Sequence, residues 1–218
     1  MSAAGRFLTL EGIEGVGKTT QVARLSKALS DRAIAHVVTR EPGGTPLAEQ
    51  IRELVLSARA ESLPDTAELL LMFAARSVHL HNSIEPQLAA GRWVICDRFT
   101  DATYAYQGAG RGLGTVSIAR LESLVQGKRR PDLTLLLDLP VTLGLARAQA
   151  RNLGAAQDAP AADRFETQRV EFFESVRAAY LARAAAEPDR MAVIDASPDA
   201  DHVAAKILSA LRVRSWIT

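Results

Sequence analysis

The sequence predicts an α/β fold in which a parallel sheet is covered by helices on both faces. Three observations lead to this prediction. Short apolar runs alternate with stretches of helical periodicity along all 218 residues. The apolar runs are continuous rather than alternating, which indicates strands buried on both faces. A glycine-rich segment joins the first apolar run to the first helical stretch, an arrangement typical of phosphate-binding helix N-termini.

Five apolar runs are expected to form the strands of this sheet. Their continuous apolar character suits the buried strands of a doubly wound fold better than the half-exposed strands of an antiparallel sheet. The runs are residues 7–10, 36–39, 93–96, 133–139 and 191–194.

Helices are expected between and after these strands, where apolar residues recur three or four positions apart. In the first of them, Val22, Leu25 and Leu29 fall on one face. The second opens near Pro46, because proline is tolerated in the first turn of a helix. The expected helical stretches are residues 22–29, 47–55, 67–88, 170–186 and 203–211. No internal repeat or clear linker interrupts this order, so we expect one domain over residues 1–218.

Composition and charge exclude several classes of protein. With 48% apolar and 23% charged residues, the chain is too apolar to be disordered. The 26 basic and 25 acidic side chains give a net charge of +1, which provides no global reason to expect nucleic-acid or membrane partners. Any anion site must therefore be local.

Cysteine usage and the apolar runs bear on location. A single cysteine excludes an intramolecular disulfide and favours a cytoplasmic protein. Cys96 lies within an apolar run, so a buried packing thiol is expected there, with a reactive thiol as the alternative. The first residues do not have the pattern of a signal peptide. The longest apolar run, residues 133–146, is too short to span a bilayer.

The segment Gly-Ile-Glu-Gly-Val-Gly-Lys-Thr, residues 12–19, matches the phosphate-binding loop pattern G-x-x-x-x-G-K-[ST]. Its glycines allow a tight backbone whose N–H groups surround a phosphate, Lys18 can reach the β- and γ-phosphates, and the Thr19 hydroxyl can bind Mg²⁺. The alternative is a glycine-rich turn with an accidental lysine. The motif predicts ATP and Mg²⁺ as ligands, and the expected phosphate-binding residues are Gly12, Ile13, Glu14, Gly15, Val16, Gly17, Lys18, Thr19 and Thr20.

Two further residues follow the third expected strand. Asp97 and Arg98 lie at a carboxyl strand end, where ligands bind in open α/β sheets. A carboxylate there can bind Mg²⁺, so Asp97 and Thr19 are the expected metal ligands, while an arginine can bind phosphate oxygens with two hydrogen bonds. The alternative is a surface ion pair. The guanine-reading tetrapeptide Asn-Lys-x-Asp is absent from the sequence, which argues against a GTPase.

Four further segments indicate which molecule accepts the phosphoryl group of ATP. They are Thr-Arg-Glu-Pro-Gly-Gly-Thr at 39–45, Cys-Asp-Arg-Phe at 96–99, Tyr-Ala-Tyr-Gln-Gly at 104–108 and Asp-Arg-Phe-Glu at 163–166. Together with the phosphate-binding loop, and in this order, they resemble thymidylate kinase over nearly the whole chain. The resemblance implies a P-loop NTPase fold of the nucleoside monophosphate kinase type, a three-layer sandwich with a five-stranded parallel sheet and a small lid at about residues 147–166. It also implies ATP-dependent phosphorylation of dTMP to dTDP and a homodimer. Other nucleotide or nucleoside kinases, an ATP-hydrolysing regulator and a non-catalytic protein remain alternatives.

The same resemblance implies a dTMP site. Pro42 would form a wall near the thymine methyl group, Tyr106 would lie under the sugar 2′ carbon, and Glu14 would face the 3′-hydroxyl. The family has a base-covering phenylalanine four positions before an arginine. Here Met72 occupies that position and Phe73 follows it, so we expect Phe73 to cover the base. The alternatives are that Met72 covers the base, or that Phe73 is a plain core residue. The implied dTMP-binding residues are Glu14, Pro42, Arg52, Met72, Phe73, Arg76, Arg98, Thr103, Tyr106, Gln107, Phe165 and Glu166.

The variable positions of the phosphate-binding loop hold no arginine. The resemblance therefore implies the bacterial subtype, which supplies its catalytic arginine from the lid, and Arg147, Arg151 and Arg164 are the candidates. Residues 152–163 are either this lid or a plain surface loop. The expected catalytic residues are Lys18, Arg98, Arg151 and Arg164, and adenine is expected near residues 195–197.

Overall fold

Five parallel strands form one sheet in the order β2-β3-β1-β4-β5 within the described residues, which are 5–57, 60–154 and 169–218 of a computed structural model. All four neighbouring pairs are parallel, and β1 lies at the centre with β3 and β4 beside it. The strands are β1 (Phe7–Glu11), β2 (His36–Arg40), β3 (Trp93–Asp97), β4 (Leu133–Asp138) and β5 (Met191–Asp195). The expected α/β fold with a five-stranded parallel sheet is thus confirmed.

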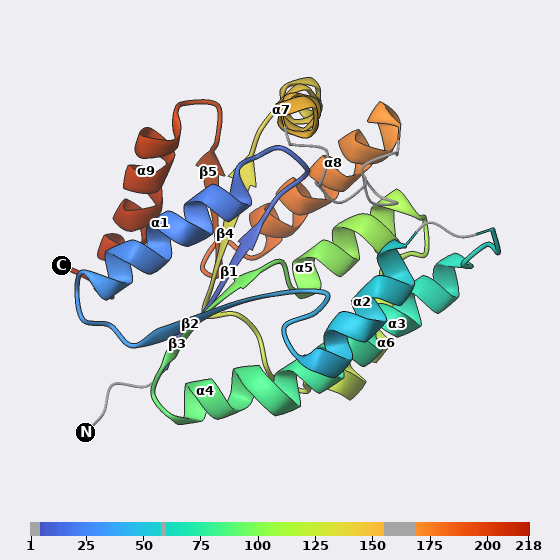
Figure 1. Cartoon of the computed structure of the whole chain (residues 1–218), viewed down its shortest axis with the longest axis horizontal. Helices are drawn as coiled ribbons and strands as arrows, with labels where there is room; N and C mark the ends of the chain where they lie inside the picture. Colours follow the sequence, from blue (N-terminus) through green and yellow to red (C-terminus); the bar gives the residue numbers. More distant parts are fainter. Residues whose placement is uncertain (1–4, 58–59, 155–168) are drawn as a thin grey trace.

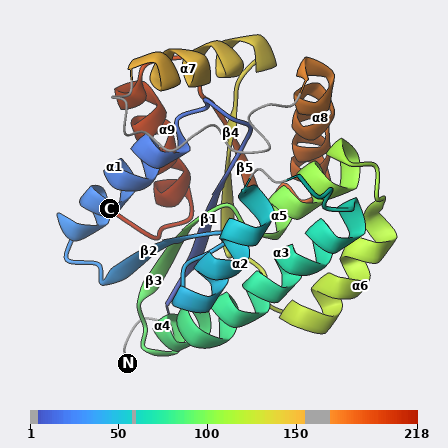
Figure 2. The ribbon, with the colours of Figure 1, turned by 45° about the vertical axis from the view of Figure 1, so that its right-hand side comes forward.

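Helices cover both faces of this sheet (Figure 1). Helices α1 and α9 pack together on one face, and α4, α5 and α8 lie on the other, with α2, α3 and α6 further out (Figure 2). Helix α7 lies beyond the carboxyl ends of the strands. The helices are α1 (Lys18–Ser30), α2 (Pro46–Leu56), α3 (Asp65–His79), η1 (Leu80–Ile84), α4 (Glu85–Ala89), α5 (Thr100–Thr103), η2 (Tyr104–Gly110), α6 (Thr115–Gln126), α7 (Val141–Gly154), α8 (Val170–Ala186) and α9 (Ala200–Val213).

Burial of the strands follows their place in the sheet. The central strands β1, β3 and β4 are almost wholly buried, as their continuous apolar sequences predict. The prediction of burial on both faces is wrong for the edge strands β2 and β5, where Val38 and Val193 are each 49% exposed. An edge strand has one neighbour fewer and is only partly covered by helices, so part of its surface reaches water.

Local sequence accounts for the helix boundaries near the site. Helix α2 begins after Thr45, whose side chain accepts a hydrogen bond from Ala48 N at 3.4 Å, and Pro46 occupies its first position. The expected long helix at 67–88 is present as three consecutive pieces, α3, the π-helix η1 and α4. In the described part of the chain, no helix has the length and apolarity needed to cross a bilayer.

Candidate active site

The phosphate-binding loop joins β1 to α1 at the carboxyl edge of the sheet. Gly17 caps α1 with a left-handed backbone, φ 89°, which a side chain would strain. A Cβ on Gly15 would come within 1.8 Å of the carbonyl oxygen of Gly144 in α7, so the loop packs directly against that helix. Ile13 and Val16 turn their side chains into the core. The loop therefore offers backbone, rather than side chains, to a ligand.

Lys18 folds back across this loop. Its Nζ donates hydrogen bonds to the carbonyl oxygens of Gly12 at 3.0 Å and Ile13 at 2.9 Å, and the residue is only 8% exposed. Burial, together with the nearby Arg98 guanidinium, lowers the pKa of Lys18 below that of an ordinary lysine. Phosphate oxygens are better partners for an ammonium group than neutral carbonyls, so Lys18 is ready to exchange these bonds for a phosphate.

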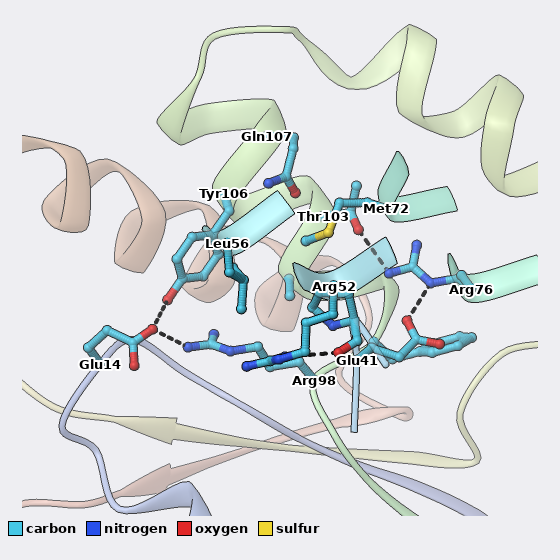
Figure 3. A pocket seen from close by; sticks show the side chains of 13 residues that line it. Glu14, Glu41, Arg52, Leu56, Met72, Arg76, Arg98, Thr103, Tyr106 and Gln107 are labelled. Carbon is cyan, nitrogen blue, oxygen red and sulfur yellow. Dashed lines mark hydrogen bonds and ion pairs between the residues drawn. The ribbon is translucent and has the colours of Figure 1, made fainter. Parts of the chain in front are cut away.

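Two cavities open at the same edge of the sheet. One, of about 1190 Å³, lies over the phosphate-binding loop and is lined by Gly15, Gly17, Lys18, Thr19, Thr20, Arg40, Asp97, Arg147, Arg151 and four residues of a shared wall. The other, of about 560 Å³, is lined by Pro42, Leu56, Met72, Arg76, Phe99, Ala102, Thr103, Tyr106, Gln107 and the same four residues (Figure 3). The shared wall consists of Glu14, Glu41, Arg52 and Arg98.

Arg98 is held at the shared wall by several contacts. Its Nη1 donates to Gly12 O at 2.9 Å, its Nη2 pairs with Glu14 at 2.5 Å, and its guanidinium lies 4.8 Å from the centre of the Tyr106 ring. Its backbone adopts φ 70°, which is uncommon outside glycine. The backbone oxygen of Arg98 accepts a hydrogen bond from the thiol of Cys96 at 3.0 Å. Cys96 is fully buried, so it is a packing thiol as expected, and burial raises the pKa of this thiol. These contacts fix the guanidinium between the two cavities.

Glu14 remains a carboxylate in this setting. Burial alone would raise its pKa, but Arg98 and then Lys18 outweigh burial, and the pKa of Glu14 is lowered. The Tyr106 hydroxyl donates to Glu14 at 3.3 Å. Glu14 and Tyr106, two of the residues that the resemblance implies for dTMP, thus lie together in the second cavity.

A buried ion pair anchors the far end of the second cavity. Arg76 Nε donates to Glu41 at 2.6 Å and its Nη2 donates to Thr103 at 2.9 Å, while His79 contacts the other oxygen of Glu41 at 3.1 Å. Arg76 and Glu41 are 3% and 4% exposed. Nη1 of Arg76 is buried and has no hydrogen-bond partner among the described residues.

Phe73 does not take the place that we expected for it. It is 2% exposed and belongs to a buried cluster with Leu69, Tyr104 and Ile118, and its ring lies 4.9 Å from the Arg76 guanidinium. Met72 lines the cavity instead. Consecutive residues point about 100° apart on a helix, so Phe73 shares the core-facing side of α3 with Leu69, and Met72 faces the cavity. The structure therefore contradicts the expectation that Phe73 covers the base, and of the two residues only Met72 lines the cavity.

The last residue of α5, Thr103, and two residues of the π-helix η2, Tyr106 and Gln107, line the same cavity. Single π-turns often occur at functional sites. Gln107 is fully buried, and its Nε2 donates to Glu68 at 2.8 Å.

Thr19 and Asp97 offer oxygen atoms of the kind that a divalent cation binds. Both line the cavity over the phosphate-binding loop, and Oδ1 of Asp97 is buried without a hydrogen-bond partner among the described residues. Mg²⁺ prefers oxygen donors and needs only one or two protein oxygens when phosphates supply others, so this pair fits the ion. Within those residues, no cluster of three or more His, Cys, Asp or Glu side chains is arranged to hold a metal.

Two of the three candidate lid arginines lie on α7. Arg147 donates to the carbonyl oxygens of Ala196 at 2.9 Å and Ser197 at 3.0 Å, and both Arg147 and Arg151 line the cavity over the phosphate-binding loop. Arg164 lies outside the described residues. So do Phe165, Glu166 and the expected lid from residue 155 onward.

Sequence reasoning missed several residues of the second cavity. Glu41 is the most important, because it lines both cavities and pairs with Arg76. The signal that could have identified it is its place in the Arg-Glu-Pro-Gly-Gly segment, directly after the second expected strand. Leu56, Phe99 and Ala102 were also missed.

A parallel α/β sheet whose phosphate-binding loop faces a second cavity across shared arginines defines a P-loop phosphotransferase. The family model for thymidylate kinase matches residues 10–207. A thymidylate kinase of Chromohalobacter salexigens is 57% identical over 215 residues, covering 97% of this chain and 98% of that protein. One of Teredinibacter turnerae is 54% identical over 207 residues, covering 95% of this chain and 97% of that protein. The crystal structure of thymidylate kinase from Ehrlichia chaffeensis superimposes with a TM-score of 0.73 at 33% identity and covers 96% of this chain and 99% of its own. The chain belongs to the thymidylate kinase family.

Proposed function

We propose that the cavity over the phosphate-binding loop holds the triphosphate of ATP and that the adjoining cavity holds dTMP. The reaction follows from the family: the chain transfers the γ-phosphoryl group of ATP to dTMP, giving ADP and dTDP, with Mg²⁺ as cofactor. The observation that carries the placement is the wall of four residues common to both cavities. Donor and acceptor phosphates would meet there.

On the donor side, the loop N–H groups from Gly12 to Thr20 and the N-terminus of α1 would bind the phosphates. Lys18 would leave the loop carbonyls for the β- and γ-phosphates. Thr19 and Asp97 would hold Mg²⁺, which neutralises charge on the phosphates when bound. Arg147 already lies on Ala196 and Ser197, which supports an adenine position near them.

On the acceptor side, the nucleophile is an oxygen of the dTMP phosphate, which is already anionic. The site therefore needs positioning and charge stabilisation rather than a strong base. Arg52, whose Nη1 donates to Pro42 O at 2.8 Å, and Arg98 would hold the acceptor phosphate from the shared wall. Arg98, Lys18 and the lid arginines Arg151 and Arg164 would stabilise the transferring group.

The nucleoside of dTMP would occupy the inner part of the second cavity. Met72 would cover the base, Pro42 would bound it near the methyl group, and Arg76, Thr103 and Gln107 would meet its polar edge. Tyr106 and Glu14 would lie beside the sugar, where a ribose hydroxyl would meet the Tyr106 ring. Phe165 and Glu166 would close over the nucleotide.

The wider organisation is part of the same proposal. The chain would act as one domain, residues 1–218, with residues 147–166 as its lid, in the cytoplasm. It would form a homodimer, and the half-exposed leucines Leu47, Leu54 and Leu70 on the adjoining helices α2 and α3 support a contact there. The single thiol, Cys96, supports a reducing compartment.

One coupled ADP-release assay tests the assignment of substrate. ATP and Mg²⁺ are supplied with dTMP, dUMP, dCMP, UMP or thymidine as the acceptor. The highest kcat/KM is expected with dTMP, because among these acceptors it alone combines the thymine methyl group, deoxyribose and an anionic phosphate. ADP release that is indifferent to the acceptor, or faster with thymidine, would contradict the proposal.

A further inference from the structure

The inner end of the second cavity holds two buried polar atoms of opposite hydrogen-bonding character. Nη1 of Arg76 can only donate, and Oε1 of Gln107 can only accept. Neither has a partner in the part of the chain that the structure describes, and both residues line the cavity. Figure 3 shows the two side chains with Thr103 between them. Buried polar atoms are rarely left unpaired in folded proteins, so this donor and this acceptor point to a ligand edge with the complementary pattern.

Each of the two atoms is fixed by a carboxylate behind it. Glu41 holds Arg76 through a 2.6 Å hydrogen bond. Glu68 holds Gln107 by accepting a 2.8 Å hydrogen bond from its Nε2, and Glu68 is fully buried on α3. Arg111 lies 3.5 Å from the second oxygen of Glu68 and holds that carboxyl group from its other side.

Glu68 therefore determines which way the Gln107 amide faces. An amide turned by 180° would exchange its oxygen and its NH₂ group. Its oxygen would then face the Glu68 carboxylate, and two acceptors without a proton between them repel each other in a buried site. With Glu68 in place, the amide oxygen faces the cavity and the NH₂ group faces away from it.

We propose that Glu68 is a positioning residue that sets the base specificity of the enzyme through Gln107. The inference rests on the proposed placement of dTMP. A pyrimidine with a carbonyl at C4 and a hydrogen on N3 matches both atoms, since the carbonyl accepts from Arg76 and N3–H donates to Gln107. A 4-aminopyrimidine such as cytosine presents a donor to Arg76 and an acceptor to Gln107, so both contacts are mismatched.

The variant Glu68→Gln tests this role. A glutamine at position 68 can present either its oxygen or its NH₂ group, so both orientations of Gln107 become available. The ratio of kcat/KM for dTMP over dCMP is expected to fall about tenfold, the equivalent of one hydrogen bond, mainly through KM. The ratio for dTMP over dUMP is expected to stay within about twofold, because dUMP presents the same edge as dTMP.

Asp65→Asn is the matched control. Asp65 lies on the same helix, one turn earlier, and pairs with Arg111 at 3.6 Å. Its amide variant removes one carboxylate from the same neighbourhood and should leave both ratios unchanged.

The inference is overturned if folded Glu68→Gln keeps the kcat/KM ratio of dTMP over dCMP unchanged. It is also overturned if the ratios of dTMP over dCMP and of dTMP over dUMP fall equally, because that would mean a reshaped cavity. If this variant does not fold, the crystal structure of the unmodified enzyme with dTMP decides. The Gln107 amide should then contact thymine N3 while keeping its contact with Glu68, and loss of either contact overturns the inference. Failure of the unmodified enzyme to phosphorylate dTMP would instead overturn the proposed function, so the two failures are distinguishable.

Discussion

Replacing Lys18 by methionine separates the role of the lysine in catalysis from its role in folding. Methionine keeps most of the side-chain volume and removes the ammonium group. Gly12 O, one of the two carbonyls bound by Lys18, also accepts from Arg98 at 2.9 Å, so it stays paired. Only Ile13 O loses its donor. One lost hydrogen bond costs about 1 kcal/mol of unfolding free energy, which lowers the Tm of a chain of this size by about 2–4 °C.

The expected effect of Lys18→Met on catalysis is far larger. A cation that meets the transferring phosphoryl group in a partly buried site contributes about 4 kcal/mol to the transition state, so kcat should fall on the order of 10³-fold. Binding of dTMP should change less than about twofold, because Lys18 lines the cavity over the phosphate-binding loop and is not among the residues lining the second cavity.

Three measurements check this prediction: kcat from ADP release, the Kd of dTMP from calorimetry without ATP, and Tm. Lys27→Met is the control, since Lys27 lies on the same helix in an exposed pair with Asp31 and should leave all three values unchanged. A Lys18→Met enzyme with kcat within tenfold of the unmodified enzyme would refute the catalytic role of the lysine. Loss of dTMP binding in parallel with kcat would refute the separation of the two cavities.

Three further perturbations test the site. Met72→Ala should raise KM for dTMP about tenfold with little change in Tm, because Met72 lines the cavity. Phe73→Ala should lower the unfolding free energy by about 3–5 kcal/mol, because Phe73 is buried in the core. The reverse pattern in Tm and KM would show that Phe73, and not Met72, contacts dTMP. Burial and the nearby Asp101 raise the pKa of Glu11 to about 8, above its value of 4.5 in the unfolded chain, so its contribution to stability is present below pH 4.5 and is lost as the pH rises through 8. Urea unfolding between pH 5 and 8.5 should therefore show a steeper fall for the unmodified protein than for Glu11→Gln, and parallel curves would contradict the raised pKa. Removal of Mg²⁺ with EDTA should abolish ADP release while dTMP still binds in calorimetry, and full turnover without the ion would argue against Thr19 and Asp97 as its ligands.

The sequence predicted most of the fold because the strands and the long helices carry strong local signals. It missed α5 and η2 for a physical reason: residues 100–108 are buried on every side, so they show no amphipathic periodicity. It also missed α6, in which only three residues are buried: Ile118, Glu122 and Gln126. Two of these are polar, so the helix has little apolar stripe to recognise.

In the site, the phosphate-binding loop was predictable because its residues are consecutive and their chemistry requires that spacing. The pairing of Glu41 with Arg76 joins residues 35 positions apart, and no local pattern encodes such a contact. The choice between Met72 and Phe73 depended on helix phase. The spacing of Leu69, Phe73 and Arg76 at four and three residues already marks one face of α3, and the structure buries that face.

The most direct test of the account is a crystal structure of the enzyme with dTMP and a non-hydrolysable ATP analogue bound together. The account predicts the analogue's triphosphate along residues 12–20 and the thymine ring beside Met72, with the acceptor phosphate at Arg98 in line with the terminal phosphate of the analogue. A triphosphate bound elsewhere, or a second cavity without dTMP, would contradict it.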